Sequence, residues 1–433
     1  MTLKVLVCGG GISGLSLACA LTQKGFEVTV LERALKYYST AGAGIQLGIN
    51  GQAVLREWGV LSTFQEVIAP VNKLTFMRSD GRPLGTTQWD DYFREKTGLV
   101  PGGVLRADLL ARLEALVPPE CIRRGVTVEK VESTKPTPSV QIVDENGDTC
   151  VESADLIIGA DGIRSRVRDA VVRDEKPPTF SEMEYWCGVC PEPELNDHPT
   201  FEQDELMELV GSKKWFLCHP AGAEGARMRV WTLIQSGRER PEDWTDDKPA
   251  VEAFKENVDK EWPEFISALV SRSIRHYHLG IYHREPVPTW FRDRVVLTGD
   301  AVHAMPPTAG QGCNMALESS YVLANVLAEA MQQPATASDR SDSSDAGARI
   351  ERALKKFERL RHTRTNNLYA LSKINAAWMV AGGRFLTPLK LWWIGTWHRG
   401  KENFATRLYE REFVNECPAL RPDGSPKTQQ PPR

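Results

Sequence analysis

Residues 9 to 14 have the composition and spacing of a phosphate-binding turn. Their sequence, Gly-Gly-Gly-Ile-Ser-Gly, satisfies the pattern G-x-G-x-x-G. Gly9 permits a tight turn, Gly11 lets the backbone approach a pyrophosphate, and Gly14 lets a helix pack closely on a strand. The unpaired N–H groups at the start of that helix would face the phosphates, together with the positive end of the helix dipole.

Glu32 extends this pattern toward a whole nucleotide. It lies 18 residues after Gly14, at the end of a second β-branched run. A carboxylate there can accept hydrogen bonds from both hydroxyl groups of an adenosine ribose, and it would repel a 2′-phosphate. The glycines alone could form an ordinary turn. With the strand–helix–strand order and the acid, the sequence predicts a site for FAD or NAD rather than NADP.

Two more acidic turns follow apolar runs that are typical of buried strands. Asp161 follows Leu-Ile-Ile-Gly-Ala, and Asp300 follows Val-Val-Leu-Thr-Gly. Asp300 can accept a hydrogen bond from a sugar-like hydroxyl group, and residues 310–314 would present backbone N–H groups at another helix start. A flavin needs both features, one for its ribityl chain and one for the electron-rich O2 of its ring system.

In this order and at these separations, the three motifs resemble those of class A FAD-dependent monooxygenases, the flavoprotein aromatic hydroxylases. The branch they are most similar to is salicylate-hydroxylase-like and common in fungal secondary metabolism, and the resemblance covers about residues 1–370. It implies that the three glycines hold the pyrophosphate, Glu32 the ribose and Asp300 the ribityl chain. It also implies FAD contacts for residues around the motifs, namely Arg33, Gly44, Ile45, Arg106, Asp161, Pro307, Gly310, Gly312 and Cys313.

The resemblance also implies a reaction. The sequence holds no second strand–G-x-G-x-x-G–helix unit, so a nicotinamide cofactor has no dedicated domain. The resemblance implies that NADPH or NADH binds transiently as the reductant. The reduced flavin would take O2 to a C4a-hydroperoxide, which an apolar pocket would shelter. Hydroxylation or epoxidation of an electron-rich aromatic substrate would follow, such as a phenolic, polyketide or indole compound.

The substrate side departs from the family pattern. Many members carry Tyr-Arg where this chain has Tyr and then Trp186, and a strand that often reads His-x-x-x-Tyr-Pro here ends in His219 and Pro. His219, with an ordinary pKa of about 6.5, is the candidate catalytic base. Trp186, with Trp215 and Trp231, would suit a flat, uncharged substrate. Packing within the core is the alternative interpretation for each of these residues.

Other functions of the same fold remain as alternatives: a flavin-dependent halogenase or reductase, or a non-catalytic carrier like the Rab GDP dissociation inhibitors. The sequence has no Trp-x-Trp-x-Ile-Pro segment and no lysine placed to relay hypohalous acid, which argues against a halogenase. A carrier would need neither Asp300 nor the flavin-ring loop, and both are present.

These residues require an α/β fold, with a Rossmann-like FAD-binding domain, a smaller substrate domain on a mixed β-sheet, and C-terminal helices. Four arginines near the C-terminal end, Arg352, Arg359, Arg361 and Arg364, are predicted to form a solvated helix face. The predicted boundaries are FAD-binding parts at 1–70, 104–180 and 283–331, substrate-domain parts at 71–103 and 181–282, a flexible loop at 332–347, C-terminal helices at 348–417 and a disordered tail at 418–433.

Composition narrows the partners and the compartment. The 433 residues carry a net charge of −4, which offers no basic field for nucleic acid. Nine scattered cysteines and an N-terminus without a cleavable signal predict a reducing, cytoplasmic setting. The apolar stretch 385–397 is shorter than the roughly 20 residues of a spanning helix. Packing within the protein is favoured for it, with a peripheral membrane contact as the alternative; the expected partner is a small aromatic substrate, and an oligomer stays possible.

Overall fold

The computed structural model describes residues 3–36, 42–133, 137–173, 175–195, 201–241, 252, 254, 262–332, 344–397 and 404–420. The predicted flexible loop at 332–347 and the predicted disordered tail at 418–433 lie mostly outside these residues. At the edges of that loop, the chain is helical up to Gln332 and again from Ser344.

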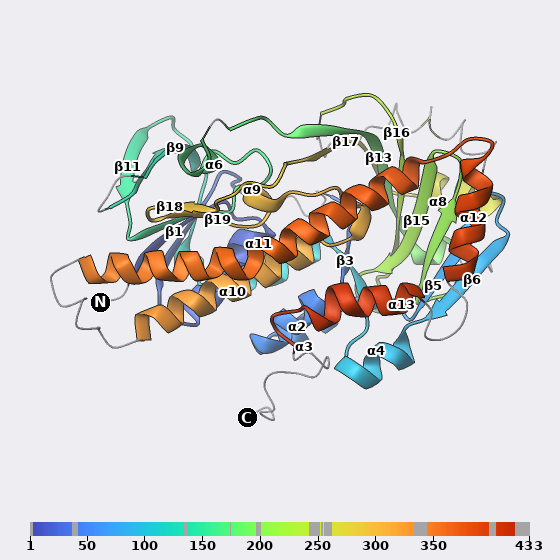
Figure 1. Cartoon of the computed structure of the whole chain (residues 1–433), viewed down its shortest axis with the longest axis horizontal. Coiled ribbons are helices and arrows are strands. Elements are labelled where there is room, and N and C mark those ends of the chain that lie inside the picture. Colours follow the sequence, from blue (N-terminus) through green and yellow to red (C-terminus); the bar gives the residue numbers. More distant parts are fainter. Residues whose placement is uncertain are drawn as a thin grey trace.

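A six-stranded sheet carries the glycine-rich turn (Figure 1). Its order is β18-β19-β12-β1-β2-β8, and every neighbouring pair is parallel except β18–β19. The central strands β1 and β12 are buried almost throughout, as expected for a parallel sheet with both faces covered. The strands are β1 (Lys4–Cys8), β2 (Glu27–Glu32), β8 (Ile122–Arg124), β12 (Leu156–Gly159), β18 (Phe291–Arg292) and β19 (Val295–Leu297).

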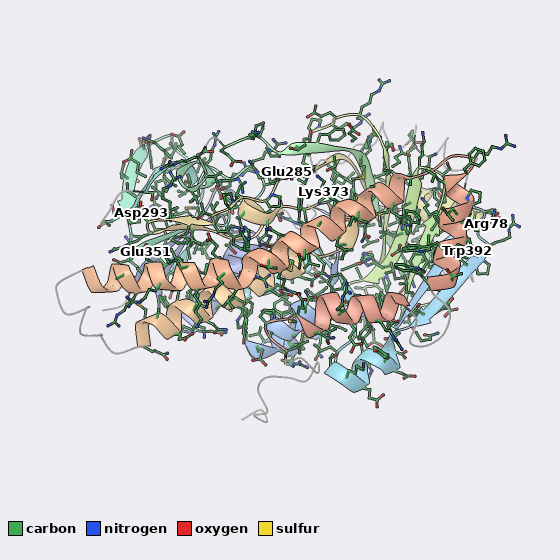
Figure 2. All side chains as sticks on the ribbon, viewed as in Figure 1. Arg78, Glu285, Asp293, Glu351, Lys373 and Trp392 are labelled. Carbon is green, nitrogen blue, oxygen red and sulfur yellow. The ribbon has the colours of Figure 1, made fainter. Side chains whose placement is uncertain are left out.

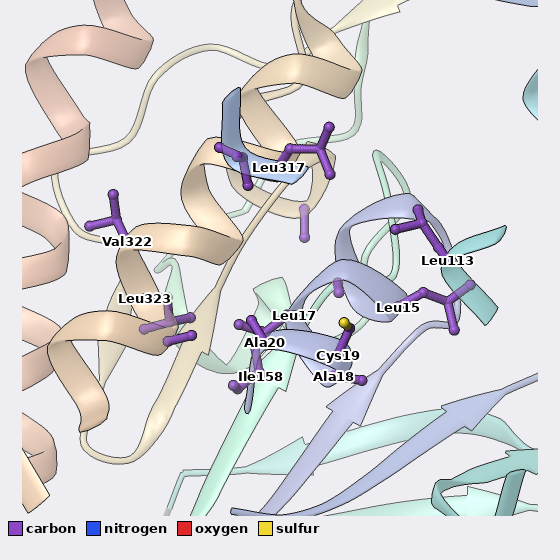
Figure 3. Packing of buried hydrophobic residues seen from close by; sticks show 14 of the residues in the cluster. Leu15, Leu17, Ala18, Cys19, Ala20, Leu113, Ile158, Leu317, Val322 and Leu323 are labelled. Atoms are coloured by element: carbon purple, nitrogen blue, oxygen red, sulfur yellow. The ribbon is translucent and has the colours of Figure 1, made fainter. Parts of the chain in front are cut away.

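Helix α1 (Ile12–Thr22) starts at the glycine-rich turn and is buried from Ser13 to Leu21. It packs between α5 (Arg106–Ala115) and α10 (Gly312–Gln332). Figure 3 shows this layer, with Leu113 from α5 on one side of α1 and Leu323 from α10 on the other. The start of α1 is therefore fixed from two sides by apolar contacts. A separate three-stranded sheet of β9 (Thr127–Glu132), β10 (Ser139–Val143) and β11 (Thr149–Ser153) precedes β12.

A second, seven-stranded sheet has the order β17-β13-β16-β15-β14-β5-β6. Adjacent strands in this sheet are antiparallel except β14 and β5, which are parallel. The strands β5 and β6 belong to an earlier part of the chain, about 100 residues before the other five strands begin. The fold class predicted from the sequence is confirmed: an α/β unit, a mixed sheet and C-terminal helices. The strands are β5 (Lys73–Arg78), β6 (Pro83–Gln88), β13 (Thr179–Pro191), β14 (Glu205–Val210), β15 (Lys214–Ala221), β16 (Met228–Ser236) and β17 (Arg275–His283).

The two faces of the seven-stranded sheet have different neighbours. The outer face packs against α8 (Glu264–Ser271) in a cluster rich in aromatic residues. The inner face packs against a small sheet of β3 (Gly44–Leu47), β7 (Gly102–Leu105) and β4 (Ala69–Pro70). Since side chains alternate along a strand, Cys187 points to the inner face and Cys190 to the outer. Although these two cysteines have the C-x-x-C spacing of some metal and redox sites, they therefore pack on opposite faces of the sheet, and no metal-binding group of side chains occurs among the described residues.

The C-terminal helices connect the two sheets. Helix α11 (Ser344–Val380) packs along α10 and reaches β15 and β16 (Figure 1). Helix α12 (Leu386–Trp397) lies against β5 and β6, and α13 (Phe404–Tyr409) continues into a π-helical turn at 410–415 that contacts α2 (Ile49–Glu57). Two short helices complete this side, α3 (Leu61–Gln65) and α4 (Asp90–Thr97). No helix within the described part of the chain is long and apolar enough to span a bilayer.

A buried charge cluster holds α2, α10 and α11 together. Glu318 of α10 is fully buried, and its carboxylate accepts hydrogen bonds from Arg361 and Arg364 of α11 and from Asn50 of α2, at 2.6 to 2.8 Å. Burial raises the pKa of Glu318, but the two guanidinium groups outweigh it and lower the pKa to about 2. The predicted solvated face is thus wrong for Arg361 and Arg364, which are buried. Arg352 and Arg359 are exposed.

We expect Glu318→Gln to lower the free energy of unfolding by about 3–5 kcal/mol, because two buried guanidinium groups lose their counter-charge. The folded pKa lies below the ordinary value of about 4.3, so this stabilisation is present above about pH 4.3 and is lost as the pH falls toward 2. Urea unfolding at several pH values measures both effects. Glu351→Gln, which removes an exposed ion pair with Lys355, serves as the control and should change stability by less than about 1 kcal/mol.

Candidate active site

The carboxyl ends of β1, β12 and β19 meet at the glycine-rich turn. Gly9 has a φ of +104°, and a Cβ on it would come within 2.5 Å of the Ala160 carbonyl oxygen. A Cβ on Gly14 would lie 1.9 Å from the Gly9 carbonyl oxygen, whereas one on Gly11 would meet no atom within 4 Å. Two of the glycines are thus required by close packing of the protein. Gly11 instead leaves open space at the start of α1, where a phosphate could approach the backbone.

Glu32 is held beside this turn. Its Oε2 accepts a hydrogen bond from the Gly10 N–H at 2.6 Å, and its Oε1 accepts one from the Ala34 N–H at 2.8 Å. The carboxylate therefore lies at the edge of the turn, the position from which a ribose could be bound. The neighbouring Arg33 is exposed.

Asp300 and Arg106 form a second polar group at the same edge. Asp300 begins α9 (Asp300–His303), and Gly299 before it packs against Ser13 of α1, so this turn adjoins the glycine-rich turn. The Asp300 side chain is accessible to solvent. The surrounding protein raises its pKa by desolvation, and the positive charge of Arg106 opposes that effect. Arg106 starts α5 and packs over Gly42, which places a cation beside an accessible carboxylate.

Asp161 has a local role that the sequence does not reveal. Its Oδ2 accepts hydrogen bonds from the backbone N–H groups of Arg166 at 2.7 Å and Val167 at 3.3 Å. Burial raises the pKa of Asp161, and hydrogen bonds from Ser165 and from these two backbone groups lower it. The carboxylate thus stabilises the turn after β12. This turn lies against Gly9, where a Cβ would come within 2.8 Å of the Asp161 Cα.

A loop at 307–313 closes the site from the other side. Pro307 starts a 3-10 turn, Gly310 has a φ of +61°, and Gly312 and Cys313 begin α10. A Cβ on Gly310 would come within 2.9 Å of the Gln46 side chain of β3, whereas one on Gly312 would meet nothing within 4 Å. Gly44 and Ile45 lie on the same strand β3. Burial raises the pKa of the Cys313 thiol to about 12, so this sulfur is a neutral neighbour of the loop.

Asn314 fixes this loop to β3, a role that its place at a predicted helix start does not reveal. Its Nδ2 donates hydrogen bonds to the carbonyl oxygens of Gln46 and Gly310, and its Oδ1 accepts one from the Gly48 N–H at 2.9 Å. The side chain is fully buried. One amide thereby sets the distance between the 307–313 loop and β3.

A cavity lies next to this loop and contains about 360 Å³ of space, part of it open to solvent. The 307–313 loop, β3, β7 and the C-terminal helix α13 all contribute to its walls. Leu206 of β14 brings the inner face of the seven-stranded sheet into the same wall. The full lining is Gln46, Gly48, Val71, Trp89, Pro101, Gly102, Leu206, Ala309, Gly310, Gln311, Asn314 and Tyr409.

Glu208 is an acidic side chain on that inner face. It follows Leu206 by two residues on β14 and therefore points the same way. Its Oε2 accepts a hydrogen bond from Trp215 Nε1–H at 2.7 Å, and the side chain is half-buried. Burial raises the pKa of Glu208 to about 7, against the effect of the Trp215 hydrogen bond. Sequence reasoning missed it, although a lone acid in the apolar run Leu-Met-Glu-Leu-Val was a usable signal.

His219 also lies on the inner face, and it is buried against backbone. Its Nδ1 is 3.0 Å from the Pro220 carbonyl oxygen, to which it can only donate. The ring lies so close to β3 and β7 that a Cβ on Gly44 or Gly103 would come within 3.1 or 2.5 Å of it. Burial lowers the pKa of His219 to about 4, so the imidazole is neutral at neutral pH.

Trp186 lies elsewhere, contrary to its predicted place beside the substrate. It stacks on His278 at 3.4 Å and on Phe254 at 4.7 Å between ring centroids, within the outer-face cluster under α8. Trp231 belongs to the same cluster, whereas Trp215 points to the inner face. The three tryptophans therefore do not form one site. Tyr185 takes the inner-face position next to Trp186, with its hydroxyl group 3.1 Å from Thr232 Oγ1.

These observations together fit an FAD molecule. The open space at Gly11 and at Gly312 lies at the starts of two helices, where backbone N–H groups can meet phosphate or ring oxygens. The half-buried carboxylate of Glu32 and the exposed carboxylate of Asp300 can accept hydrogen bonds from sugar hydroxyl groups, and Arg106 supplies a positive charge near Asp300. A model of the family described as "FAD binding domain" matches residues 2–354.

The chain belongs to this family. It is 28% identical over 371 residues to 3-amino-4-hydroxybenzoate 2-monooxygenase PtmB3 of Streptomyces platensis, covering 86% of this chain and 87% of that protein. It is 30% identical over 327 residues to the 3-amino-4-hydroxybenzoate 2-monooxygenase of Streptomyces cremeus, covering 75% and 78%. The FAD-dependent monooxygenase penM of Penicillium crustosum is 26% identical over 399 residues, covering 88% and 80%.

Solved structures share the fold. Klebsiella pneumoniae HpxO, complexed with FAD and uric acid, has a TM-score of 0.77 at 22% identity and covers 96% of both chains. A salicylate hydroxylase substrate complex has a TM-score of 0.72 at 19% identity, covering 96% of this chain and 97% of the other. The resemblance inferred from the sequence is confirmed, and the chain is an FAD-dependent monooxygenase of the class A type. These relatives do not favour the halogenase, reductase or carrier alternatives.

Two alanine substitutions separate packing from cofactor binding. Gly14→Ala should lower the free energy of unfolding of the apoprotein by about 1–3 kcal/mol, because its Cβ would clash with the Gly9 carbonyl oxygen. Gly11→Ala should leave that stability within about 0.5 kcal/mol and weaken FAD binding about tenfold, because the methyl group takes space needed by the pyrophosphate. Thermal unfolding and FAD titration by fluorescence measure the two effects. Unchanged FAD affinity in Gly11→Ala would place the pyrophosphate elsewhere.

Proposed function

We propose that this enzyme uses NADPH or NADH and O2 to hydroxylate or epoxidise an electron-rich aromatic compound of the phenolic, polyketide or indole class. The observation that carries the proposal is the cavity between the 307–313 loop and the inner face of the seven-stranded sheet. It adjoins the loop that would hold the flavin ring, and its walls combine apolar and aromatic side chains with few polar groups. Such a wall suits a flat aromatic molecule.

We further propose that FAD lies along the edge where the three strands of the parallel sheet end. Backbone groups at Gly9, Gly11 and Gly14 would hold the pyrophosphate, and Glu32 the adenosine ribose. Asp300 and Arg106 would bind the ribityl and phosphate region. The remaining proposed contacts are Arg33, Gly44, Ile45, Asp161, Pro307, Gly310, Gly312 and Cys313; among them, Asp161 acts through the turn that it stabilises.

When bound, FAD supplies the activation of O2 for transfer to the substrate. The protein's own tasks are to orient the substrate, exclude water and move a proton. Trp89, Val71 and Tyr409 supply an apolar wall that keeps water from the reacting atoms. Asn314 donates a hydrogen bond to the Gln46 carbonyl oxygen and so holds the 307–313 loop at a constant distance from β3 beside that wall.

Glu208 is the group that we assign to the proton. With a pKa raised to about 7 by burial, it can accept a hydrogen bond or a proton from a hydroxyl, amino or ring N–H group of the substrate. Trp215 holds one of its oxygen atoms, which leaves the other for the substrate. His219 is a weaker base, since burial lowers its pKa to about 4, and its ring touches β3 and β7. We therefore propose that His219 positions β3, and that Trp186 only supports the sheet.

The names of relatives agree with this substrate class. The two Streptomyces relatives act on 3-amino-4-hydroxybenzoate, and a Pseudomonas fluorescens relative, 28% identical over 337 residues, is a 6-hydroxynicotinate 3-monooxygenase. Both substrate names specify a ring with a hydroxyl group, which donates the kind of hydrogen bond that Glu208 accepts. We also infer a reducing compartment such as the cytoplasm, because all nine cysteines are free and most are buried.

A direct test uses the purified holoenzyme. It should be yellow, and electron-rich phenols or indoles should stimulate NADPH or NADH oxidation, with O2 consumed and one oxygen atom added to the product by mass spectrometry. Asp300→Ala should purify with little FAD. Colourless protein that cannot be loaded with FAD, or loaded protein that oxidises NADPH with no oxygenated product from any aromatic tested, would contradict the proposal.

Glu208→Gln should lower kcat/KM for the best aromatic substrate by about a hundredfold while leaving the rate of flavin reduction unchanged. Because Glu208 accepts only when ionised, the parent rate should rise with pH through about 7, and the variant should lose that dependence. Stopped-flow reduction and a pH profile of turnover measure the two parts. Glu205→Gln, the same change on the opposite face of β14, is the control. A normal profile in Glu208→Gln and a lost one in His219→Ala would assign the proton to His219.

A further inference from the structure

Helix α12 presents an apolar surface to solvent. Four large apolar side chains are exposed here: Phe385, in the turn just before the helix, is 84% exposed, and Leu386, Leu389 and Trp392 of the helix are 53%, 54% and 65% exposed. Nine exposed large hydrophobic residues occur among the described residues, so four of them gather within eight consecutive positions. The spacing of 385, 389 and 392 places them along one side of the helix. We call these four residues the α12 face. The packing predicted for the stretch 385–397 is therefore wrong for these four side chains.

The opposite side of α12 is firmly attached. Lys390 is 1% exposed, and its Nζ donates hydrogen bonds to the carbonyl oxygens of Trp378, Met379 and Ala381 at the end of α11. The same ammonium group lies 5.4 Å from the ring centroid of Trp215. Ile394 is also buried. The α12 face is thus exposed on a helix that is fixed in place. Single hydrophobic residues scattered over a surface need no explanation, but a contiguous group such as this one indicates an interaction site.

The chain segment that carries the α12 face has charged residues of one sign only. Residues 359–401 contain no Asp or Glu, although the whole chain has 57 such residues in 433. Arg384 next to the face is exposed, and so is Lys213 on the adjoining loop, where Ser212 Oγ accepts a hydrogen bond from the Gly383 N–H at 3.0 Å. Asp80, in the turn between β5 and β6, is paired with two arginines, Arg78 and Arg82. Figure 2 shows Arg78 and Trp392 at the same end of the molecule.

We propose that the α12 face docks this enzyme on the surface of an anionic lipid bilayer. Phe, Trp and Leu side chains on one side of a short helix, with cations beside them and no acidic residue between positions 359 and 401, are the features of a helix that lies in the membrane interface. Lys and Arg are attracted by anionic lipid headgroups. A second copy of the chain would bring the same cations against each other, so charge complementarity favours the lipid surface over self-association.

The docked position would bring the membrane near the substrate cavity. Lys390 lies on the inner side of α12 and over Trp215, which in turn holds Glu208. Through Trp215, α12 therefore adjoins the inner face of the seven-stranded sheet, from which Leu206 reaches the cavity. A lipid-soluble aromatic substrate would reach such a cavity from the bilayer.

Sedimentation of the FAD-loaded protein with vesicles tests the proposal without any turnover. Vesicles of phosphatidylcholine and phosphatidylserine should bind the parent protein, and vesicles of phosphatidylcholine alone should bind it more weakly. The double variant Phe385→Ser, Trp392→Ser should bind the mixed vesicles at least about tenfold more weakly, since two large apolar side chains are lost. Raised salt and Arg384→Gln should both reduce the preference for phosphatidylserine.

The control is the double variant Val151→Ser, Ile374→Ser, because these two side chains are 66% and 65% exposed but lie outside the α12 face. It should bind vesicles like the parent. FAD absorbance and thermal unfolding confirm that all variants are folded and loaded, which separates this test from that of the catalytic function. Equal vesicle binding by both double variants would overturn the proposal. So would a parent that binds no vesicles and instead sediments as a dimer that Trp392→Ser dissociates.

Discussion

The contact between Gly9 and Gly14 is the constraint on which the cofactor side of the enzyme depends. The Gly9 carbonyl oxygen occupies the place that any side chain at Gly14 would need, so strand β1 and helix α1 approach each other through bare backbone. This approach points the start of α1 at the carboxyl edge of the sheet, where Asp161, Asp300 and the 307–313 loop also arrive. Apolar packing of α1 between α5 and α10 then keeps it there.

The substrate side depends on a different kind of interaction, the hydrogen bonds and ion pairs of buried polar side chains. Asn314 ties the 307–313 loop to β3, and Glu318 one helical turn later ties α10 to α2 and α11. Both residues lie on α10, so one helix fixes the loop that would face the flavin ring and the helix that reaches the seven-stranded sheet. Buried polar groups with all partners in place specify a single arrangement more sharply than apolar packing does. The cavity owes its shape to this pairing.

The sequence allowed most of the cofactor side to be predicted, because each part of it is local. A glycine pattern, an acid at the end of the next strand and an acid after a buried strand are all contiguous in the chain. The substrate side was harder, since it is decided by strand register and by distant partners. A shift of one residue separates Trp186, which points to α8, from Tyr185, which points to β3. Arg361 and Arg364 are buried because Glu318 lies opposite them, more than forty residues away in sequence.

The ammonium group of Lys390 has a consequence for the whole molecule. It donates to three carbonyl oxygens at the end of α11, where the hydrogen bonds within the helix run out, and it anchors α12 by the same three hydrogen bonds. A helix pinned in this way cannot swivel, so its outward side has one direction relative to both sheets. A planar surface bound to this side would therefore determine the orientation of the whole enzyme. All copies bound to that surface would hold their cavities at the same depth and in the same orientation.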